Sequence, residues 1–322
     1  MQPFEYLNTT YGLIWTISCI PIGCLLAFFG VWILNHIPAK WLCDYNETPD
    51  AELLSGKRFS YVSTGIPTAI AMAVCLVLCR LQFNKGYDIY FLLLSLIIYI
   101  ALLIAASDLK YQIIPDQFTI AIGVLAAAVS VYDLVRGFNI LHGAWWSPLA
   151  GAGIGAAVMI LIDVIGMIVY HRDGMGFGDV KLFLAIGILT GFPGTIYAFI
   201  ISILTATVFF VIIIVLSRIM GAKTGTAEEA AENKPEAETM QGADAAAMTK
   251  EKDPEKNTDE KEGSPVQEID GEDDEQTEPE ENEVGFGSYL AFGPYIAIAV
   301  CAYIALFDLI QYLTGLYLSL FN

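Results

Sequence analysis

The chain has 322 residues, of which 56% are hydrophobic and only 16% are charged. An average soluble domain is about 25% charged, and here the apolar residues form blocks of about twenty, long enough to cross a bilayer. This composition excludes a soluble globular protein and predicts an all-α polytopic membrane protein. The net charge of −19 lies mainly in residues 222–284, which leave only −3 for the rest, so no nucleic-acid partner is expected.

Eight stretches are apolar enough to cross a membrane, and their continuous rather than alternating pattern predicts helices. In chain order they are residues 11–37, 65–82, 87–107, 117–136, 147–170, 180–192, 195–218 and 290–313. The first lysine is Lys40, so no basic n-region precedes the first span. That span is therefore expected to stay in the mature protein.

Charge asymmetry between the loops predicts the orientation, because Lys and Arg favour the cytoplasmic side. With the N-terminus outside, the inner loops hold eight Lys and Arg before the bulk of the acidic tract is counted, against three in the outer loops. Both chain ends then lie outside. The segments expected in the cytoplasm are 38–64, 108–116, 171–179 and 219–289.

Composition also divides the chain. Residues 1–64 hold the first span and a short cytoplasmic loop, and the membrane core is expected over 65–221 and 285–322. Residues 222–284 hold 22 acidic residues and 6 lysines with few large apolar ones, which predicts a disordered insertion because little surface can be buried. The cysteines form no C-x-x-C pair and the histidines no H-E-x-x-H, so no metal site is predicted.

A carboxylate closes the third predicted span, in the sequence S-D-L-K-Y-Q-I-I-P-D at residues 107–116. Pro115 suits the first turn of the next helix, where the dipole favours Asp116. Asp108 lies instead at the C-terminal end of a helix, where an anion is disfavoured. It is either a functional residue or a solvated interfacial residue paired with Lys110.

The fifth span begins with two glycines at the spacing G-x-x-x-G, Gly151 and Gly155. The same glycines match a dinucleotide-binding pattern, which would need a preceding strand. A helix-packing face is the expected role.

A second carboxylate follows the glycine-rich sequence D-G-M-G-F-G-D-V-K at residues 173–181. Gly176 and Gly178 permit a sharp turn and the close approach of another group. Asp179 then begins the sixth span from the same membrane face as Asp108. Considered by itself, this pattern is equally explained by a turn and by dipole matching at a helix start.

As a pair, the two carboxylates indicate a functional site more strongly than either one does by itself, because ionisable residues at membrane depth are usually functional. Two close carboxylates cannot both ionise easily, so they share a proton. The ionised one can take a proton from water, and the protonated one can donate to a peptide carbonyl oxygen. If Asp108 and Asp179 approach one another, they can cleave a peptide bond by acid–base catalysis.

These motifs resemble those of the type IV prepilin peptidases, bacterial polytopic aspartic proteases with a G-x-G-D motif. The matching residues are Asp108 with I-P-D at 114–116, then G-F-G-D-V-K-L at 176–182, and F-G-P-Y at 292–295 before the last span. The likeness covers most of residues 20–313 apart from the acidic insertion.

The resemblance implies an enzyme of the bacterial inner membrane that removes the leader of prepilin or pseudopilin precursors at the cytoplasmic face. It implies that Asp108 and Asp179 are the catalytic pair. The residues expected to support them are Gly176, Gly178, Pro115, Asp116 and Lys181. The expected partners are the precursor and the lipid bilayer, and the oligomeric state is left open.

No cofactor is expected for proteolysis. Many members of the family also methylate the new terminus with S-adenosylmethionine and carry two C-x-x-C pairs in the first cytoplasmic loop. Here that loop, 38–64, contains only Cys43. Weak or absent methyltransferase activity is therefore expected, and S-adenosylmethionine is needed only if that activity is retained.

Two alternatives stay open at this stage. A presenilin-like protease shares G-x-G-D but pairs it with Tyr-Asp and a later P-A-L, whereas Ser107 precedes Asp108 here and no P-A-L occurs. A proton-coupled transporter would also use paired carboxylates, though near mid-span and in repeated halves.

Overall fold

The computed structural model describes residues 9–43, 49, 51–54, 56–83, 87–137, 141–170, 176–232 and 292–320. Within these ranges every regular element is helical and there is no strand, which confirms the predicted all-α class. The chain divides into two units, 1–216 with 289–322, and 217–288. The first unit is described below. The acidic segment 222–284 lies outside the described residues from position 233 onward.

The helices that build the first unit follow the predicted spans closely. They are α2 (Thr10–His36), α4 (Ile66–Gln82), α5 (Asp88–Tyr111), α6 (Asp116–Arg136), α7 (Ser147–Tyr170), α8 (Phe177–Glu232), α9 (Gly293–Ala305) and α10 (Phe307–Leu320). Shorter turns connect α2 to α4, namely η1 (Ala39–Leu42), α3 (Ala51–Leu54) and η2 (Tyr61–Gly65). Six helices are long and apolar enough to cross a membrane, or seven if α9 and α10, bent by 80°, count as one span.

Two differences separate the structure from the eight predicted spans. The eighth, 290–313, is broken by the bend between α9 and α10. The sixth and seventh are joined in α8, whose backbone is not helical at Gly191 (φ 67°, ψ −177°). The rings of Phe183 and Phe199 are 5.9 Å apart, although sixteen residues of straight helix would separate them by about 24 Å. The chain therefore reverses at Gly191. As a helical hairpin, α8 supplies both predicted spans, 180–192 and 195–218.

The hairpin of α8 packs against α7 through the two glycines of the G-x-x-x-G pair. A Cβ atom on Gly151 would lie 2.4 Å from the carbonyl oxygen of Gly187, and one on Gly155 would lie 2.9 Å from that of Phe183. The backbones are in direct contact at both points. The expected role of these glycines in helix packing is confirmed.

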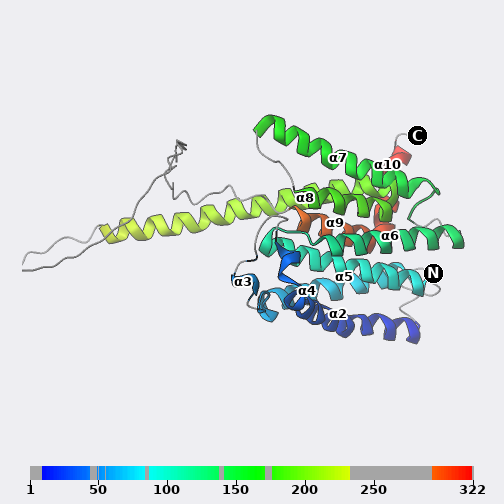
Figure 1. The fold of residues 1–322 in the computed structure, drawn as a ribbon, viewed down its shortest axis with the longest axis horizontal. Helices are drawn as coiled ribbons and strands as arrows, with labels where there is room; N and C mark the ends of the chain where they lie inside the picture. Colours follow the sequence, from blue (N-terminus) through cyan, green and yellow to red (C-terminus); the bar gives the residue numbers. More distant parts are fainter. Residues whose placement is uncertain are drawn as a thin grey trace, which may run out of the picture. The chain divides into compact units, whose positions relative to one another are not determined.

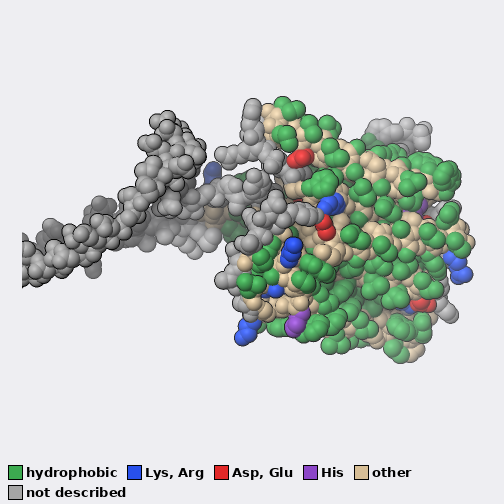
Figure 2. All heavy atoms as spheres, viewed as in Figure 1, with side chains coloured by type: hydrophobic (Ala, Val, Ile, Leu, Met, Phe, Trp, Pro, Cys, Tyr) green, Lys and Arg blue, Asp and Glu red, His purple; other side chains and the backbone are tan. Residues whose placement is uncertain are grey.

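The core of the first unit is centred on α5 and α9. Eleven of the thirteen residues of α9 are buried, which is typical of a helix surrounded by others. Large apolar side chains are exposed along α2, α4, α7 and α8, and Figure 2 shows hydrophobic side chains over much of the visible side of the bundle. Such a surface suits contact with lipid.

The helices alternate in direction, so their ends gather at two faces of the first unit (Figure 1). The C-terminal end of α5 lies at the same face as the N-terminal ends of α6, α8 and α9. This face carries both sequence motifs with aspartate.

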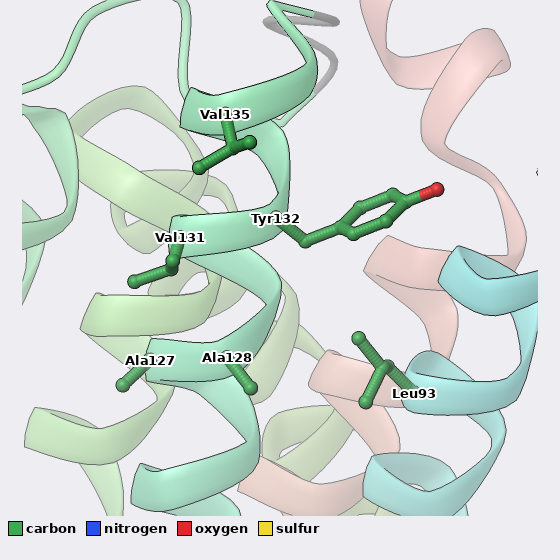
Figure 3. Close-up of a pocket in the computed structure, with 6 residues that line it drawn as sticks. All are labelled: Leu93, Ala127, Ala128, Val131, Tyr132 and Val135. Atoms are coloured by element: carbon green, nitrogen blue, oxygen red, sulfur yellow. The ribbon is translucent and has the colours of Figure 1, made fainter.

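An apolar groove between α5 and α6 lies away from that face (Figure 3). Leu93 of α5 faces a set of α6 side chains there, Ala127, Ala128, Val131, Tyr132 and Val135. Fifteen residues of α5 separate Leu93 from Asp108, which corresponds to about 22 Å. The groove is therefore a feature of the apolar side of the bundle, separate from the carboxylates.

Candidate active site

Asp108 lies in the last turn of α5 and is buried, with 4% of its surface exposed. Gln112 ends the helix in the left-handed conformation (φ 54°), and its N–H donates to the carbonyl oxygen of Asp108 at 2.9 Å. The Nζ atom of Lys110 donates to the carbonyl oxygen of Arg58. The alternative of a solvated Asp108 at the interface is therefore wrong, because the side chain is removed from water.

The connection from α5 to α6 is short and fixed by hydrogen bonds. Ser107 Oγ donates to the carbonyl oxygen of Ile113 at 2.9 Å. Pro115 is the N-cap of α6 and Asp116 its first residue, so the predicted helix start is confirmed. Pro115 stands one position earlier than expected, just before the first turn.

Asp179 lies in the first turn of α8, as predicted, and is 7% exposed. Its N–H donates to the carbonyl oxygen of Gly176 at 3.0 Å, which closes the turn that begins the helix. Its carboxylate lies close enough to Asp108 for electrostatic repulsion between the two. The structure thus brings together the two carboxylates that the sequence separates by about seventy residues.

Two glycines near the carboxylates differ in how tightly they are packed. A Cβ atom on Gly178 would lie 3.2 Å from Cβ of Ile114, so α8 approaches the α5–α6 connection closely at this point. A Cβ atom on Gly176 would meet none of the described residues within 4 Å. Close packing therefore requires a glycine at 178, whereas steric space alone does not require one at 176.

An ion pair ties α8 to α6 beside this contact. Lys181 Nζ donates to both carboxylate oxygens of Asp116, at 2.9 and 3.0 Å. Both side chains are about one-third exposed. Asp116 and Lys181 thus connect the two motifs.

Asp108 and Asp179 both lie where a negative charge is disfavoured. Burial penalises the charged form of each, and two anions at this separation repel one another. Oδ2 of Asp108 and Oδ1 of Asp179 are buried and make no hydrogen bond with any residue that the structure describes. Buried polar atoms without a partner are rare, and their presence is typical of a functional site.

The sequence predicts no specific role for Gly293, although this residue belongs to the F-G-P-Y motif. A Cβ atom at Gly293 would lie 2.6 Å from Oδ2 of Asp108 and 3.0 Å from Cδ1 of Ile114. The N-terminal end of α9 thus lies directly against the carboxylate of Asp108. A glycine before a proline at a helix start was the available signal, but it does not indicate which distant residue lies opposite.

Two further residues, for which the sequence predicts no role, organise the loop between α2 and α4. Buried Arg58 donates from Nε and Nη1 to the carbonyl oxygens of Leu53 and Ile37, each at 2.5 Å. Asn35 binds both backbone groups of Phe59, with Oδ1 accepting at 2.7 Å and Nδ2 donating at 3.0 Å. The loop is therefore fixed to the end of α2.

No group of three His, Cys, Asp or Glu side chains within the described ranges is placed to hold a metal ion. The stretch 171–175, with Asp173, lies outside those ranges.

Comparison with known proteins locates the likeness on the same part of the chain. Residues 95–211 match the sequence model of the type IV leader peptidase family. A curated relative, the prepilin leader peptidase/N-methyltransferase of Bacillus subtilis (strain 168), is 28% identical over 158 residues, which cover 48% of this chain and 56% of the relative. The chain thus matches just over half of that relative's length. No solved structure matches.

The matched segment contains Asp108, Asp179 and all five residues expected to support them. The resemblance inferred from the motifs is confirmed over residues 95–211: this part of the chain is similar in sequence to the type IV leader peptidases.

Proposed function

We propose that the protein is a membrane-embedded aspartic endopeptidase that removes the N-terminal leader from prepilin-like precursors. The observation that carries the proposal is the burial of Asp108 against Asp179, each with an unpartnered carboxylate oxygen. The family match over residues 95–211 supports peptidase chemistry for this pair.

The chemistry follows from one proton shared between two carboxylates. The ionised carboxylate takes a proton from a water molecule, whose oxygen attacks the carbon of the scissile peptide bond. The protonated carboxylate donates its proton to the carbonyl oxygen, which avoids a free oxyanion. The proton taken from water then moves to the amide nitrogen as the C–N bond breaks, and the other carboxylate recovers its proton from the gem-diol.

We place the cleavage at the cytoplasmic face of the bacterial inner membrane. The positive-inside rule supports this orientation, since the inner loops carry most of the Lys and Arg. A site at the ends of α5 and α8 suits a substrate whose leader lies in water and whose following helix lies in lipid. The substrate class comes from the family resemblance and stays a proposal.

The test is co-expression with a prepilin, scored by the gel shift that follows removal of the leader. Asp108→Asn and Asp179→Asn should each reduce cleavage by about 10²–10⁴-fold, because one carboxylate cannot serve as both base and acid. The double variant should be no worse than either single one. The exposed Asp308 of α10 offers a matched control, and Asp308→Asn should cleave normally at equal expression.

Near-wild-type cleavage by either single variant would contradict the proposed dyad. The competing proposal is a proton-coupled transporter built on the same carboxylates. It predicts proton flux in liposomes that depends on Asp108 and Asp179, with no cleavage of any prepilin.

Methylation of the new terminus stays a prediction of weak or absent activity. The relative's name includes an N-methyltransferase, but the first cytoplasmic loop of this chain has Cys43 without the cysteine pairs. The described residues of that loop do not form a set that we can assign to S-adenosylmethionine. Mass spectrometry of the mature pilin decides the point, and full conversion to a terminus heavier by one CH₂ would contradict the prediction.

A further inference from the structure

We propose that α10 is an interfacial helix, which lies in the plane of the membrane at the face opposite the two carboxylates and inserts one apolar side among the lipid chains. Its partner is the bilayer itself, at the boundary between the polar headgroups and the hydrocarbon. The inference concerns how the last helix meets the membrane, and it holds whether or not the chain is a peptidase.

The direction of α10 is set by the break that follows α9. The two helices meet at Leu306 and are bent by 80° relative to one another. The N-terminal end of α9 lies against Asp108, and at its other end the carbonyl oxygen of Ala305 accepts from Nε2 of Gln82, the last residue of α4, at 3.3 Å. α10 therefore begins at the face opposite the carboxylates and runs across the other helices (Figure 1).

One side of α10 faces the protein. Phe307 is buried, and Ile310 and Thr314 are half-buried on the same side of the helix. The hydroxyl oxygens of Thr314 and Tyr197 are 3.0 Å apart. Tyr197 follows the reversal of α8 at Gly191, so α10 lies at the end of the bundle where the hairpin of α8 turns.

A second side of α10 is apolar and exposed. Five large side chains recur there at the spacing i, i+3, i+4, i+7 and i+8, which places them on one face of a helix. They are 48–68% exposed, and they are Leu309, Tyr312, Leu313, Leu316 and Tyr317. This face continues the exposed apolar surface that the spanning helices present to lipid, which argues for the same partner.

The third side distinguishes α10 from the spanning helices, because its side chains are polar or absent. Asp308, Gln311, Gly315 and Ser319 are all exposed, at the spacing i, i+3, i+7 and i+11. A helix surrounded by hydrocarbon would hold a carboxylate and an amide in lipid, which is costly. Water on the polar side and lipid on the apolar side satisfy both sets of side chains, which is the arrangement of an interfacial helix.

Aromatic side chains mark the same boundary at the start of α7. Trp145 and Trp146 are 74% and 48% exposed, and the ring centroid of Trp146 is 6.3 Å from that of Phe192, beside the reversal of α8. Tryptophan and tyrosine concentrate at the boundary between headgroups and hydrocarbon. Tyr312 and Tyr317 lie at the two edges of the apolar side of α10, where a helix at this depth would place them.

Charge does not contribute to this contact. Many interfacial helices carry Lys and Arg that attract anionic headgroups, but residues 307–320 contain neither. Burial of the apolar side must then provide the affinity for lipid. The lack of cations also suits the outer face of the membrane, since Lys and Arg favour the inner one.

The test is a cysteine scan of α10 in the full-length protein in lipid nanodiscs, where both membrane faces meet water. A charged, water-soluble maleimide should modify Asp308→Cys, Gln311→Cys and Ser319→Cys about tenfold or more faster than Leu309→Cys, Leu313→Cys and Leu316→Cys, because a thiol in hydrocarbon does not ionise. The unsubstituted chain gives the background from its six native cysteines. The pattern should be the same with and without anionic phospholipid in the nanodisc.

A second measurement on the unsubstituted protein identifies what covers the apolar side. A phospholipid that carries a diazirine in its acyl chain should label α10 at Leu309, Leu313 or Leu316, and peptide mapping should find no label at Gln311.

The possible outcomes separate the alternatives. Uniform modification along α10 would place the helix in water, and uniform protection would place it inside hydrocarbon or protein; either result would overturn the proposal. If the apolar side is an interface between two copies of the chain, the nanodiscs would contain dimers, Leu313→Cys would form a disulfide-linked dimer on oxidation, and the diazirine label would be missing. That result would also overturn it. Leader cleavage is not measured, so failure of the peptidase proposal leaves these outcomes unchanged.

Discussion

At the scale of single residues, the site contains polar groups whose burial costs free energy. Burying an unpaired carboxylate costs several kcal/mol, and the protein buries two that are close enough to repel one another. Structural residues elsewhere in the described chain show the usual solution, since His142 Nδ1 pairs with Asp133 Oδ2 at 3.0 Å and the ring's Nε2 contacts the carbonyl oxygen of Ile188 at 3.1 Å. Asp108 and Asp179 each have a carboxylate oxygen without a hydrogen-bond partner among the described residues, which is typical of a functional site.

The ion pair of Asp116 and Lys181 should matter much less than the dyad. Both side chains are about one-third exposed, and such pairs are worth about 0.2–1 kcal/mol. Asp116→Asn should therefore reduce leader cleavage by less than tenfold, in the same gel-shift assay. Combining it with Lys181→Gln should add little to either change, because they remove the same interaction. A loss as large as that of Asp108→Asn would place Asp116 in the chemistry.

The two glycines of the second motif should respond differently to alanine. At Gly178 the added methyl group would lie 3.2 Å from Cβ of Ile114, whereas at Gly176 it meets none of the described side chains. A misplacement of about 1 Å can cost about 10²-fold in rate, and a shift of a few tenths should cost several-fold. Gly178→Ala should therefore lower kcat while Gly176→Ala stays near the wild type. The reverse order would show that backbone conformation at 176, rather than packing at 178, positions Asp179.

At the scale of elements, the reversal of α8 determines how the fifth, sixth and seventh predicted spans are arranged. Gly191 adopts a positive φ at the turn, and Ser147 Oγ accepts from the N–H of Phe192 at 3.0 Å. Ser147 therefore caps the second half of α8 from the start of α7. The turn fixes both halves of the hairpin against α7.

The contact of α7 with α8 should be sensitive to a single methyl group. Gly151→Ala would place Cβ 2.4 Å from a backbone oxygen of α8, which can be relieved only by moving a helix. Overpacking of this kind costs about 1–3 kcal/mol. Thermal unfolding in detergent should show a lower Tm for Gly151→Ala. The control is Gly153→Ala on the same helix, where a Cβ atom would meet none of the described residues within 4 Å, and equal Tm values would contradict the close contact.

At the scale of the whole molecule, the net charge and the chemistry belong to different parts of the chain. The acidic segment 222–284 carries most of the negative charge, while Asp108, Asp179 and Gly293 come from the unit of residues 1–216 and 289–322. Residues 222–232 of this segment belong to α8, and the rest lies between α8 and α9 in sequence. Nothing in the site that we describe requires its side chains.

Deletion of residues 225–282 should therefore preserve leader cleavage. The remaining residues still connect α8 to α9, and all the motif residues are retained. The measurement is cleavage in detergent by the deletion variant, with its fold checked by Tm. A folded variant without any activity would show that the acidic segment takes part in substrate binding or catalysis.

The sequence by itself determined the class of the protein, the approximate bounds of its spans and the two carboxylates. A bilayer requires about twenty consecutive apolar residues and a fully bonded backbone, and both requirements can be evaluated along the chain without knowing any contact. For the same reason the helix start at Asp116 and the packing glycine Gly151 were predictable, since caps and small-residue spacing are local signals.

Only the tertiary structure decided which distant residues meet. The partner of Lys181, the contact of Gly178 with Ile114 and the approach of Gly293 to Asp108 depend on how helices pack across as many as 185 positions of sequence. A hydrophobic pattern specifies which face of a helix is apolar, but lipid and protein satisfy that face equally well. The tertiary packing therefore places the N-terminal end of α9 opposite Asp108, which no local pattern in the sequence could predict.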